Sequence, residues 1–541
     1  MIKYLRKVRA ARKKNAFFQV KSFDFDQQEQ GNRVYTEDEL EKTDFTPSLE
    51  KNMDFLKKIT GSNVDLVTRF IKIGRSEAKP AAILFFDNLI DPILLDQHIV
   101  KPLVLDAYAT GLRTGPEIIE QLRVGNLITR AELKGINNFK ELMDGLLIGE
   151  VVLFVEGLNS ALLISTKGYK GRDVAEPGAE PVVRGPRDSF VETLSINLSL
   201  IRRRLRSPNL VIEPVNIGKI TNTKVCVSHL KGVCSPDLVR EVHERLKRIN
   251  VDGILESGYI EEFIEDHPYS PFPQVGVTER PDRVAAALLE GRVAIFTDTT
   301  PMVLIVPGEF FSLMQAAEDY YNRFFFTSLI RLMRYIAFAI ALFLPAFYIA
   351  ISNYHQEMIP TQLLVSIIAA RQGVPMPAFL EALLMEFAFE ILREAGVRLP
   401  RPVGQAVSIV GALVIGQAAV QASLVSPLMV IVVAMTGIAN FAIPQFNISL
   451  SVRTLRFPLM ILAAVLGLYG VMTGLLVILL HMFSLRSFGV PYMAPVSPFK
   501  PKDLKDVMVR APWWALTRRP SQTADSSSRM PAGQMPRPPE K

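Results

Sequence analysis

The strongest constraint on the fold is a run of 51 residues, 402–452, that contains no Asp, Glu, Lys or Arg. A second uncharged run covers 457–485, and a third covers Tyr335–Ile351. A helix of about 20 apolar residues is long enough to cross the hydrocarbon core of a bilayer. The chain is 49% hydrophobic with a mean hydropathy of +0.22, and its apolar residues are concentrated after residue 328. We therefore predict a membrane domain in this part of the chain.

The predicted membrane domain is all-α and polytopic, and it occupies 326–485. Its complete spans are expected at 329–351, 403–425, 427–448 and 458–483. A broken or re-entrant segment is expected at 361–394, because Gly373, Pro375 and Pro377 interrupt it and acidic residues follow. Each charge at mid-bilayer would cost roughly 2.5 to 3.5 kcal/mol, so the acidic helix should face protein, water or the interface.

The residues before the apolar part predict a cytoplasmic N-terminal region of two α/β (α+β) subdomains, 51–180 and 181–325. Strand-like apolar runs alternate there with helical patterns, which is typical of a layered domain. A Gly- and Pro-rich segment, Gly168–Phe190, is expected to connect the two subdomains. A flexible charged arm is predicted at 1–50, and a basic, Pro-rich tail at 486–541.

The orientation follows from basic residues beside the first span. Arg323, Arg331 and Arg334 precede it, whereas His355 and Glu357 follow it. The positive-inside rule then places the N-terminal region in the cytoplasm. Five crossings would put the tail outside, and four or six would put it inside; the sequence leaves both open.

Catalytic chemistry finds little support in the sequence. The six histidines share no spacing with a nucleophile or a second ligand, and the two cysteines have no nearby histidine. We predict no enzyme, no catalytic or metal site and no cofactor. The basic clusters favour a solvated face or contact with anionic lipid headgroups, and no nucleic-acid motif accompanies them.

One charged stretch, Ser270–Pro301, could be an active-site loop or a structural element before the membrane. Pro281 suits the first turn of a helix, Asp282 favours the positive end of its dipole, and Gly291 can end it. Two strands joined by a turn are expected to follow. We predict subunit contacts here and in the preceding connector, at Glu279, Arg280, Asp282, Arg184 and Arg187.

Several stretches together resemble the family of GerA-type spore germination receptor A subunits. They are Arg184–Leu205, Ser270–Asp282, Leu288–Pro301, Ala316–Tyr335, Ile359–Leu364 and Phe488–Pro495. The resemblance implies a multi-pass protein of the spore inner membrane that works with a permease-like B subunit and a lipoprotein C subunit. It also implies a homo-oligomer, a pentamer, that conducts monovalent cations when the complex senses nutrients.

Other functions stay open beside this one. The resemblance extends to the sporulation protein SpoVAF, an accessory channel or scaffold of the same membrane. The broken segment also allows a secondary transporter, since discontinuous helices often form substrate sites.

Two sets of residues are candidates for ion conduction. Small and polar residues at helical spacing either line a pore or let helices pack closely; they are Gln405, Ser408, Ala412, Ile415 and Ala419. Acidic residues repeated around a ring would select cations; they are Glu381, Glu386 and Glu390. Local pairing is the alternative for the second set, because Glu390 lies three residues from Arg393.

Overall fold

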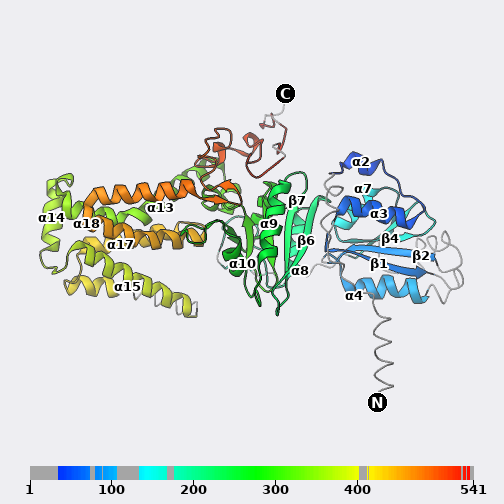
Figure 1. Ribbon diagram of the computed structural model, residues 1–541, viewed down its shortest axis with the longest axis horizontal. Helices are drawn as coiled ribbons and strands as arrows, with labels where there is room; N and C mark the ends of the chain where they lie inside the picture. The colour runs from blue at the N-terminus through cyan, green and yellow to red at the C-terminus, as the bar shows by residue number, and fades with distance from the viewer. Residues whose placement is uncertain are drawn as a thin grey trace, which may run out of the picture.

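The computed structural model describes residues 34–61, 63–73, 79–87, 89–106, 133–166, 176–178, 180–400, 411, 414–525, 528–531 and 533–536. The chain is elongated, with the first soluble subdomain at one end, the second in the middle and the helical region at the other end (Figure 1). The predicted fold class is confirmed: two mixed α and β subdomains precede an all-helical part.

The first subdomain is built on a five-stranded antiparallel sheet in the order β1-β2-β4-β5-β3. The strands are β1 (Leu66–Ile73), β2 (Lys79–Phe86), β3 (Leu133–Ile136), β4 (Glu150–Val155) and β5 (Ala161–Ser165). The unbroken apolar run of β2 is explained by helices on both faces of the sheet, since Leu84 packs toward one layer and Ile83 toward the other.

Those two layers have different helices. One face carries α2 (Glu37–Glu41), α3 (Leu49–Thr60) and α7 (Phe139–Leu147), and the other carries α4 (Pro92–Leu95) with the π-helical turns Asp96–Val100 and Pro102–Asp106. The predicted charged arm therefore differs from the structure in its last part. Leu40, Phe45 and Leu49 are buried in the first core, because they lie on the apolar side of otherwise charged segments.

The second subdomain repeats the same plan with the strand order β6-β7-β9-β10-β8, again entirely antiparallel. Its strands are β6 (Leu210–Ile217), β7 (Thr223–Leu230), β8 (Gly276–Thr278), β9 (Val293–Thr297) and β10 (Val303–Val306). One face is covered by α8 (Leu194–Arg204) and α11 (Pro281–Leu289), and the other by α9 (Pro236–Arg248) and α10 (Ser257–Ile264). The predicted helix at Pro281 and the two strands after it are confirmed, with Gly291 at φ 83° just beyond the helix.

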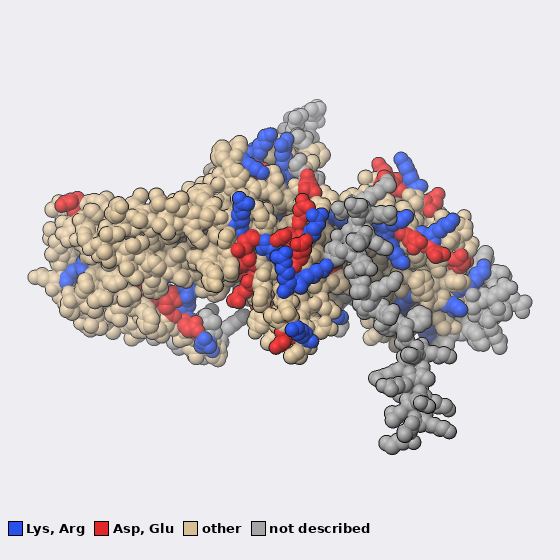
Figure 2. Space-filling view, in the orientation of Figure 1, with Lys and Arg blue, Asp and Glu red and all other residues tan. Residues whose placement is uncertain are grey.

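The helical region begins with α13 (Phe324–Tyr354), after the short helix α12 (Phe310–Leu313). It continues with α14 (Thr361–Arg371), α15 (Ala378–Arg398), α17 (Pro427–Phe441) and α18 (Phe446–Ser484), and 414–421 are also helical. Among the described residues, α13 and α18 are the two helices that are long and apolar enough to cross a membrane. The surface of this region carries few charges in the view of Figure 2, whereas charged side chains gather over the two subdomains.

Two predicted spans differ from the structure. The span at 427–448 is interrupted between α17 and α18, around Pro444, which cannot donate a helical hydrogen bond. The span at 458–483 is not one straight helix, because Gly467 adopts φ 61° and ψ −142°, a conformation that favours glycine. A Cβ atom on Gly470 would lie 2.1 Å from the carbonyl oxygen of Leu462, so α18 folds back on itself as a hairpin.

This hairpin returns the chain to the second subdomain. The described residues of the tail contact that subdomain: Arg529 pairs with Glu290 at 2.8 Å, and Thr523 donates a hydrogen bond to the Glu290 carbonyl, also at 2.8 Å. The tail and the second subdomain are therefore at the same end of the helical region, and the number of membrane crossings stays a prediction.

Candidate functional site

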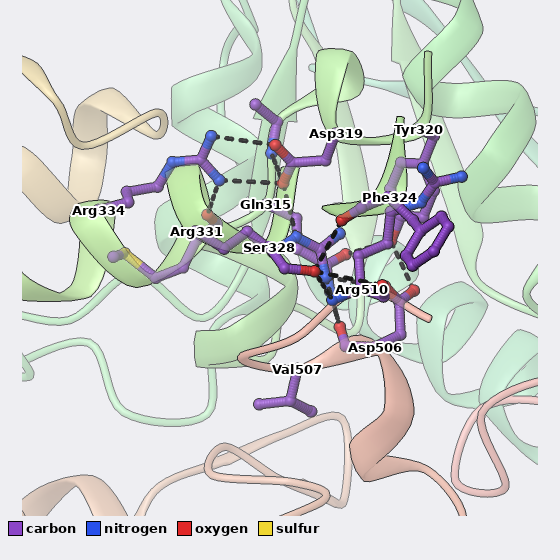
Figure 3. A network of polar contacts seen from close by, with 12 residues as sticks. Gln315, Asp319, Tyr320, Phe324, Ser328, Arg331, Arg334, Asp506, Val507 and Arg510 are labelled. Carbon is purple, nitrogen blue, oxygen red and sulfur yellow. Dashed lines mark hydrogen bonds and ion pairs between the residues drawn. The ribbon is translucent and has the colours of Figure 1, made fainter. Parts of the chain in front are cut away.

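A buried cluster of arginine and aspartate joins the second subdomain, α13 and the tail (Figure 3). We call it the junction cluster; its charged members are Asp319, Arg331, Arg334, Asp506 and Arg510. Arg331 and Arg334 lie three residues apart on one face of α13, and both donate to Asp319, on the 3-10 turn Ala317–Tyr320. The Arg331 Nε to Asp319 Oδ2 distance is 2.8 Å, and the Arg334 Nη1 distance to the same oxygen is 3.0 Å.

The tail completes this cluster through Asp506. Its Oδ1 accepts from Arg331 Nη1 at 2.8 Å, and its Oδ2 accepts from the Tyr320 hydroxyl at 2.7 Å. Its backbone carbonyl accepts from Gln315 Nε2, also at 2.7 Å. Segments 175 residues apart in the sequence are thus fixed to one another around a single arginine.

Electrostatics favour the ionised form of Asp319. Burial alone would raise the pKa of Asp319, but hydrogen bonds and charge from Arg334 and Arg331 outweigh it and lower that pKa below the usual range. Burial and the neighbouring Asp506 carboxylate raise the pKa of Tyr320 well above its ordinary value, so this phenol stays a neutral donor. Removing one charged side chain from such a buried set would leave the opposite charges of its partners uncompensated.

The predicted subunit-contact residues of the charged stretch are buried inside the chain. Arg280 forms two bonds to Asp282, at 2.7 and 3.1 Å, and donates to the carbonyls of Glu180 and Pro186 at 3.0 Å each. Glu279 is also buried. These groups hold the connector between the two subdomains, so they have little surface left for a second subunit.

Arg184 and Arg187 lie on the same connector and are exposed. Arg187 forms a long surface pair with Glu176, at 3.4 Å. Subunit contact remains a prediction for these two residues.

The connector contacts continue toward the helical region. The Tyr321 hydroxyl donates a short hydrogen bond to Asp282, and Tyr321 is the neighbour of Tyr320 in the junction cluster. Hydrogen bonds therefore lead from Arg280 through Asp282 to Tyr321, and the backbone links Tyr321 to the junction cluster just before α13.

Replacing Arg280 with lysine tests whether the hydrogen bonds from its guanidinium group to Asp282 and to two backbone carbonyls stabilise the fold. A lysine keeps the charge but cannot satisfy Asp282 and two carbonyls together, so Arg280→Lys is expected to lower the free energy of unfolding by about 1.5 to 3 kcal/mol. Thermal unfolding of the purified full-length protein measures this loss. The control is Arg240→Lys, in an exposed pair with Asp237, where a change within about 0.5 kcal/mol is expected. Equal losses in the two variants would contradict the assignment.

The predicted cation-selecting carboxylates all have arginine partners within the chain. Glu386 pairs with Arg456 at 2.5 Å, and both side chains are almost fully buried. Glu390 pairs with Arg393 at 2.6 Å and with Arg453 at 2.5 Å. These contacts favour the local pairing that the sequence also allowed over an unpaired acidic ring.

The third carboxylate holds a helix end. Glu381 Oε2 accepts from the backbone amide of Ser426 at 2.8 Å, just before α17, and Arg371 of α14 lies 3.2 Å from Oε1. It thereby joins three helices, since Glu381 itself belongs to α15.

The predicted pore-lining residues are only partly within the described chain. Gln405, Ser408 and Ala412 lie outside it, whereas Ile415 is exposed and Ala419 is buried. Pore lining therefore stays a prediction.

In the part of the chain that the structure describes, no group of three His, Cys, Asp or Glu residues could hold a metal ion. Cys226 and Cys234 are free and buried, and burial raises the pKa of each thiol to about 12. Burial also lowers the pKa of His229 to about 4.

A pH-sensitive carboxyl lies where α10 meets the start of α18. Burial, with repulsion from Glu265 and Glu256, raises the pKa of Glu261 from 4.5 to about 7, against a hydrogen bond from Asn447 at 3.3 Å. The folded state therefore holds this proton more tightly than the unfolded state does. The resulting stability is present below about pH 4.5 and is lost as the pH rises toward 7.

Glu261→Gln is accordingly expected to raise the free energy of unfolding by about 1 to 3 kcal/mol near pH 8 and to change it little near pH 4. Thermal unfolding of the full-length protein at the two pH values checks this. Glu262→Gln removes only one of the weaker charges that raise the pKa of Glu261, so its gain near pH 8 should be much smaller. A gain for Glu261→Gln of the same size at both pH values would contradict the raised pKa.

Sequence reasoning did not find Asp319 or Asp506. Arg331 and Arg334 were noticed only as positive charges beside a span, and nothing in the pattern separates a buried arginine from one that faces headgroups. The signal that could have found the cluster is the pair of arginines at spacing three within an apolar helix, because buried charges need partners.

Comparisons with known proteins identify the family. The model of the Bacillus/Clostridium GerA spore germination protein family matches residues 54–522. Spore germination protein KA of Bacillus subtilis (strain 168) is 48% identical over 480 residues, covering 88% of this chain and 87% of that protein. Spore germination protein B1 of the same organism is 40% identical over 474 residues, covering 88% and 97%.

A solved structure also matches: the N-terminal domain of the A subunit of the Bacillus megaterium spore germinant receptor GerK3. It is 34% identical, with a TM-score of 0.41, and the match covers 50% of this chain and 98% of that one. With a family match over most of its length and relatives at such identity, the chain belongs to the GerA family of spore germination proteins.

Proposed function

We propose that this protein is the membrane subunit of a spore germinant receptor and acts as a gated channel for monovalent cations. In this proposal it lies in the spore inner membrane with its two subdomains in the cytoplasm. It assembles as a homo-oligomer, a pentamer, together with a permease-like B subunit and a lipoprotein C subunit. Nutrient sensed by the complex opens the channel, and cation release triggers germination.

The observation that carries the proposal is the attachment of α13 to the soluble region by two sets of polar contacts, one at Asp282 and Tyr321 and the other in the junction cluster. A channel controlled by a soluble region needs a stiff attachment between that region and a membrane helix. The junction cluster supplies one, because Arg331 is bound to Asp319 before the helix and to Asp506 after the last helix. Motion of the second subdomain would therefore reach the first and the last helices together.

Cation flux tests the proposal. The chain is reconstituted with its B and C subunits in vesicles loaded with potassium, and potassium release is measured with and without nutrient. Passive, nutrient-triggered release is expected, and it should be lost when this chain is left out. Saturable solute uptake would favour a transporter instead, and neither activity would favour a scaffold. The size of the purified assembly tests the oligomer separately.

A further inference from the structure

The tail carries an exposed apolar surface beside the base of α13. It consists of Met508, Val509, Trp513 and Trp514, which lie within seven residues of the chain, and we call it the tail apolar surface. Trp513 is 46% exposed and Trp514 37%, although burying an indole ring is strongly favourable. Large apolar side chains grouped on a surface mark a contact with something other than water.

Hydrogen bonds to the start of α13 fix the position of this surface along the axis of that helix. The Arg510 backbone amide donates to Ser328 Oγ at 3.2 Å, and Arg510 Nη1 donates to the Asn322 carbonyl at 2.8 Å. Trp513 Nε1 donates to the Tyr320 carbonyl at 3.2 Å. The residues around Trp513 are therefore level with the first turns of α13, at the end of the helical region that meets the second subdomain (Figure 1).

The same turns of α13 already show lipid-facing chemistry on their outer side. Phe325 is 80% exposed, and Phe326, Leu329 and Met333 are exposed as well, while Arg331 and Arg334 point inward to Asp319. Exposed Phe, Leu and Met side chains suit contact with acyl chains better than contact with water, so the hydrocarbon region would begin near these turns of α13.

The positive charge and the tryptophans of the tail suit a position at the membrane interface. Apart from Arg510 and Asp506, which are held in the junction cluster, residues 500–519 contain five Lys or Arg and one Asp, which suits an anionic headgroup layer. Tryptophan prefers the interface, where its ring is apolar and its N–H can still be bonded, as the Trp513 N–H is here.

From this geometry we infer that the tail apolar surface docks into the lipid interface of the membrane that α13 crosses. Residues 508–514 form a second membrane contact of the chain, held to α13 by Arg510 and Ser328. The occupant is the headgroup and upper acyl region of an anionic bilayer. The inference requires α13 to be embedded, but it does not depend on ion conduction.

Intrinsic fluorescence offers a direct test, because Trp513 and Trp514 are the only two tryptophans in the chain. The full-length protein is placed in phosphatidylglycerol and phosphatidylcholine vesicles whose acyl chains are brominated near the headgroup or near the terminal methyl. Bromine quenches tryptophan on close contact. Emission is expected to fall with both lipids, and to fall more with bromine near the headgroup.

Three variants sharpen this test. Trp513→Phe and Trp514→Phe each leave one reporter, and each is expected to keep the depth-dependent loss of emission. The control carries both Phe substitutions and Phe70→Trp, at an exposed position of β1 in the first subdomain, and should show no quenching. Only variants that unfold at the wild-type temperature are compared.

Unquenched emission from both single-tryptophan variants would overturn the inference, since it would mean that water or another protein covers the surface. Stronger quenching by bromine near the terminal methyl would also overturn it, because the tail would then be buried in the membrane core. Equal quenching of the Phe70→Trp control would show non-specific contact and count against it in the same way.

Discussion

Asp319→Asn is expected to lower the free energy of unfolding by about 3 to 5 kcal/mol, because it removes the one carboxylate shared by two buried arginines. The amide keeps the size of the side chain but cannot compensate Arg331 and Arg334, whose bonds to Asp319 measure 2.8 to 3.1 Å. Thermal or denaturant unfolding of the full-length protein in detergent measures the loss. Nutrient-triggered germination should also fall in spores that carry the variant.

The matched control is Asp237→Asn, which removes an exposed partner of Arg240 in the same subdomain. Surface pairs contribute about 0 to 1 kcal/mol, so this variant should stay close to wild type. If Asp319→Asn were as stable as Asp237→Asn, the junction cluster would not hold the helical region to the second subdomain.

Arg456→Met is expected to cost a similar amount, about 3 to 5 kcal/mol, because it leaves Glu386 buried without a partner among the helices. Arg456 also donates to the Ala341 carbonyl of α13 at 2.8 Å, so the substitution removes a contact between α13 and α18 as well. Adding Glu386→Gln to Arg456→Met should recover much of the stability, since the uncompensated charge is then gone. Unfolding of the single and double variants in lipid nanodiscs measures the difference.

The control for this pair is Arg398→Gln, at an exposed i,i+4 pair with Glu394, where a loss below about 1 kcal/mol is expected. Flux measurements on Glu386→Gln separate pairing from ion selection. Local pairing predicts reduced stability with unchanged cation selectivity, whereas a changed selectivity would favour an acidic ring. No recovery in the double variant would contradict the pairing of Glu386 with Arg456.

Local signals in the sequence were sufficient for the soluble subdomains. Unbroken apolar runs such as Ala81–Phe86 predict strands buried on both faces, and Pro281 with Gly291 brackets a helix at both ends. Each of these patterns involves only a few neighbouring residues, so it can be recognised in a single sequence.

Long-range features could not be predicted in the same way. The hairpin in α18 depends on one glycine within an apolar run that also suits a straight helix. The junction cluster depends on Arg331 meeting Asp506, 175 residues away, and no local pattern records that distance. The burial of Arg280 was missed for the same reason, since its partners at Glu180 and Pro186 lie in another segment.

The fold also limits how the proposed channel can move. The tail returns to the second subdomain, so the first and last helices share one anchor at the junction cluster. The hairpin at Gly467 is the opposite end of the helical region, where Tyr354 at the end of α13 donates to the Ala464 carbonyl at 2.7 Å. A gating motion in the proposed mechanism would therefore tilt α13 and α18 together.

The most direct test of the central proposal is an electrical recording from the complete receptor in a planar bilayer. This chain, with its B and C subunits, should give discrete current steps carried by monovalent cations when nutrient is added. Asp319→Asn receptor that still assembles should show fewer openings at the same nutrient concentration. A correctly assembled wild-type receptor that passes no current with nutrient, although spores with the same receptor germinate, would contradict the account.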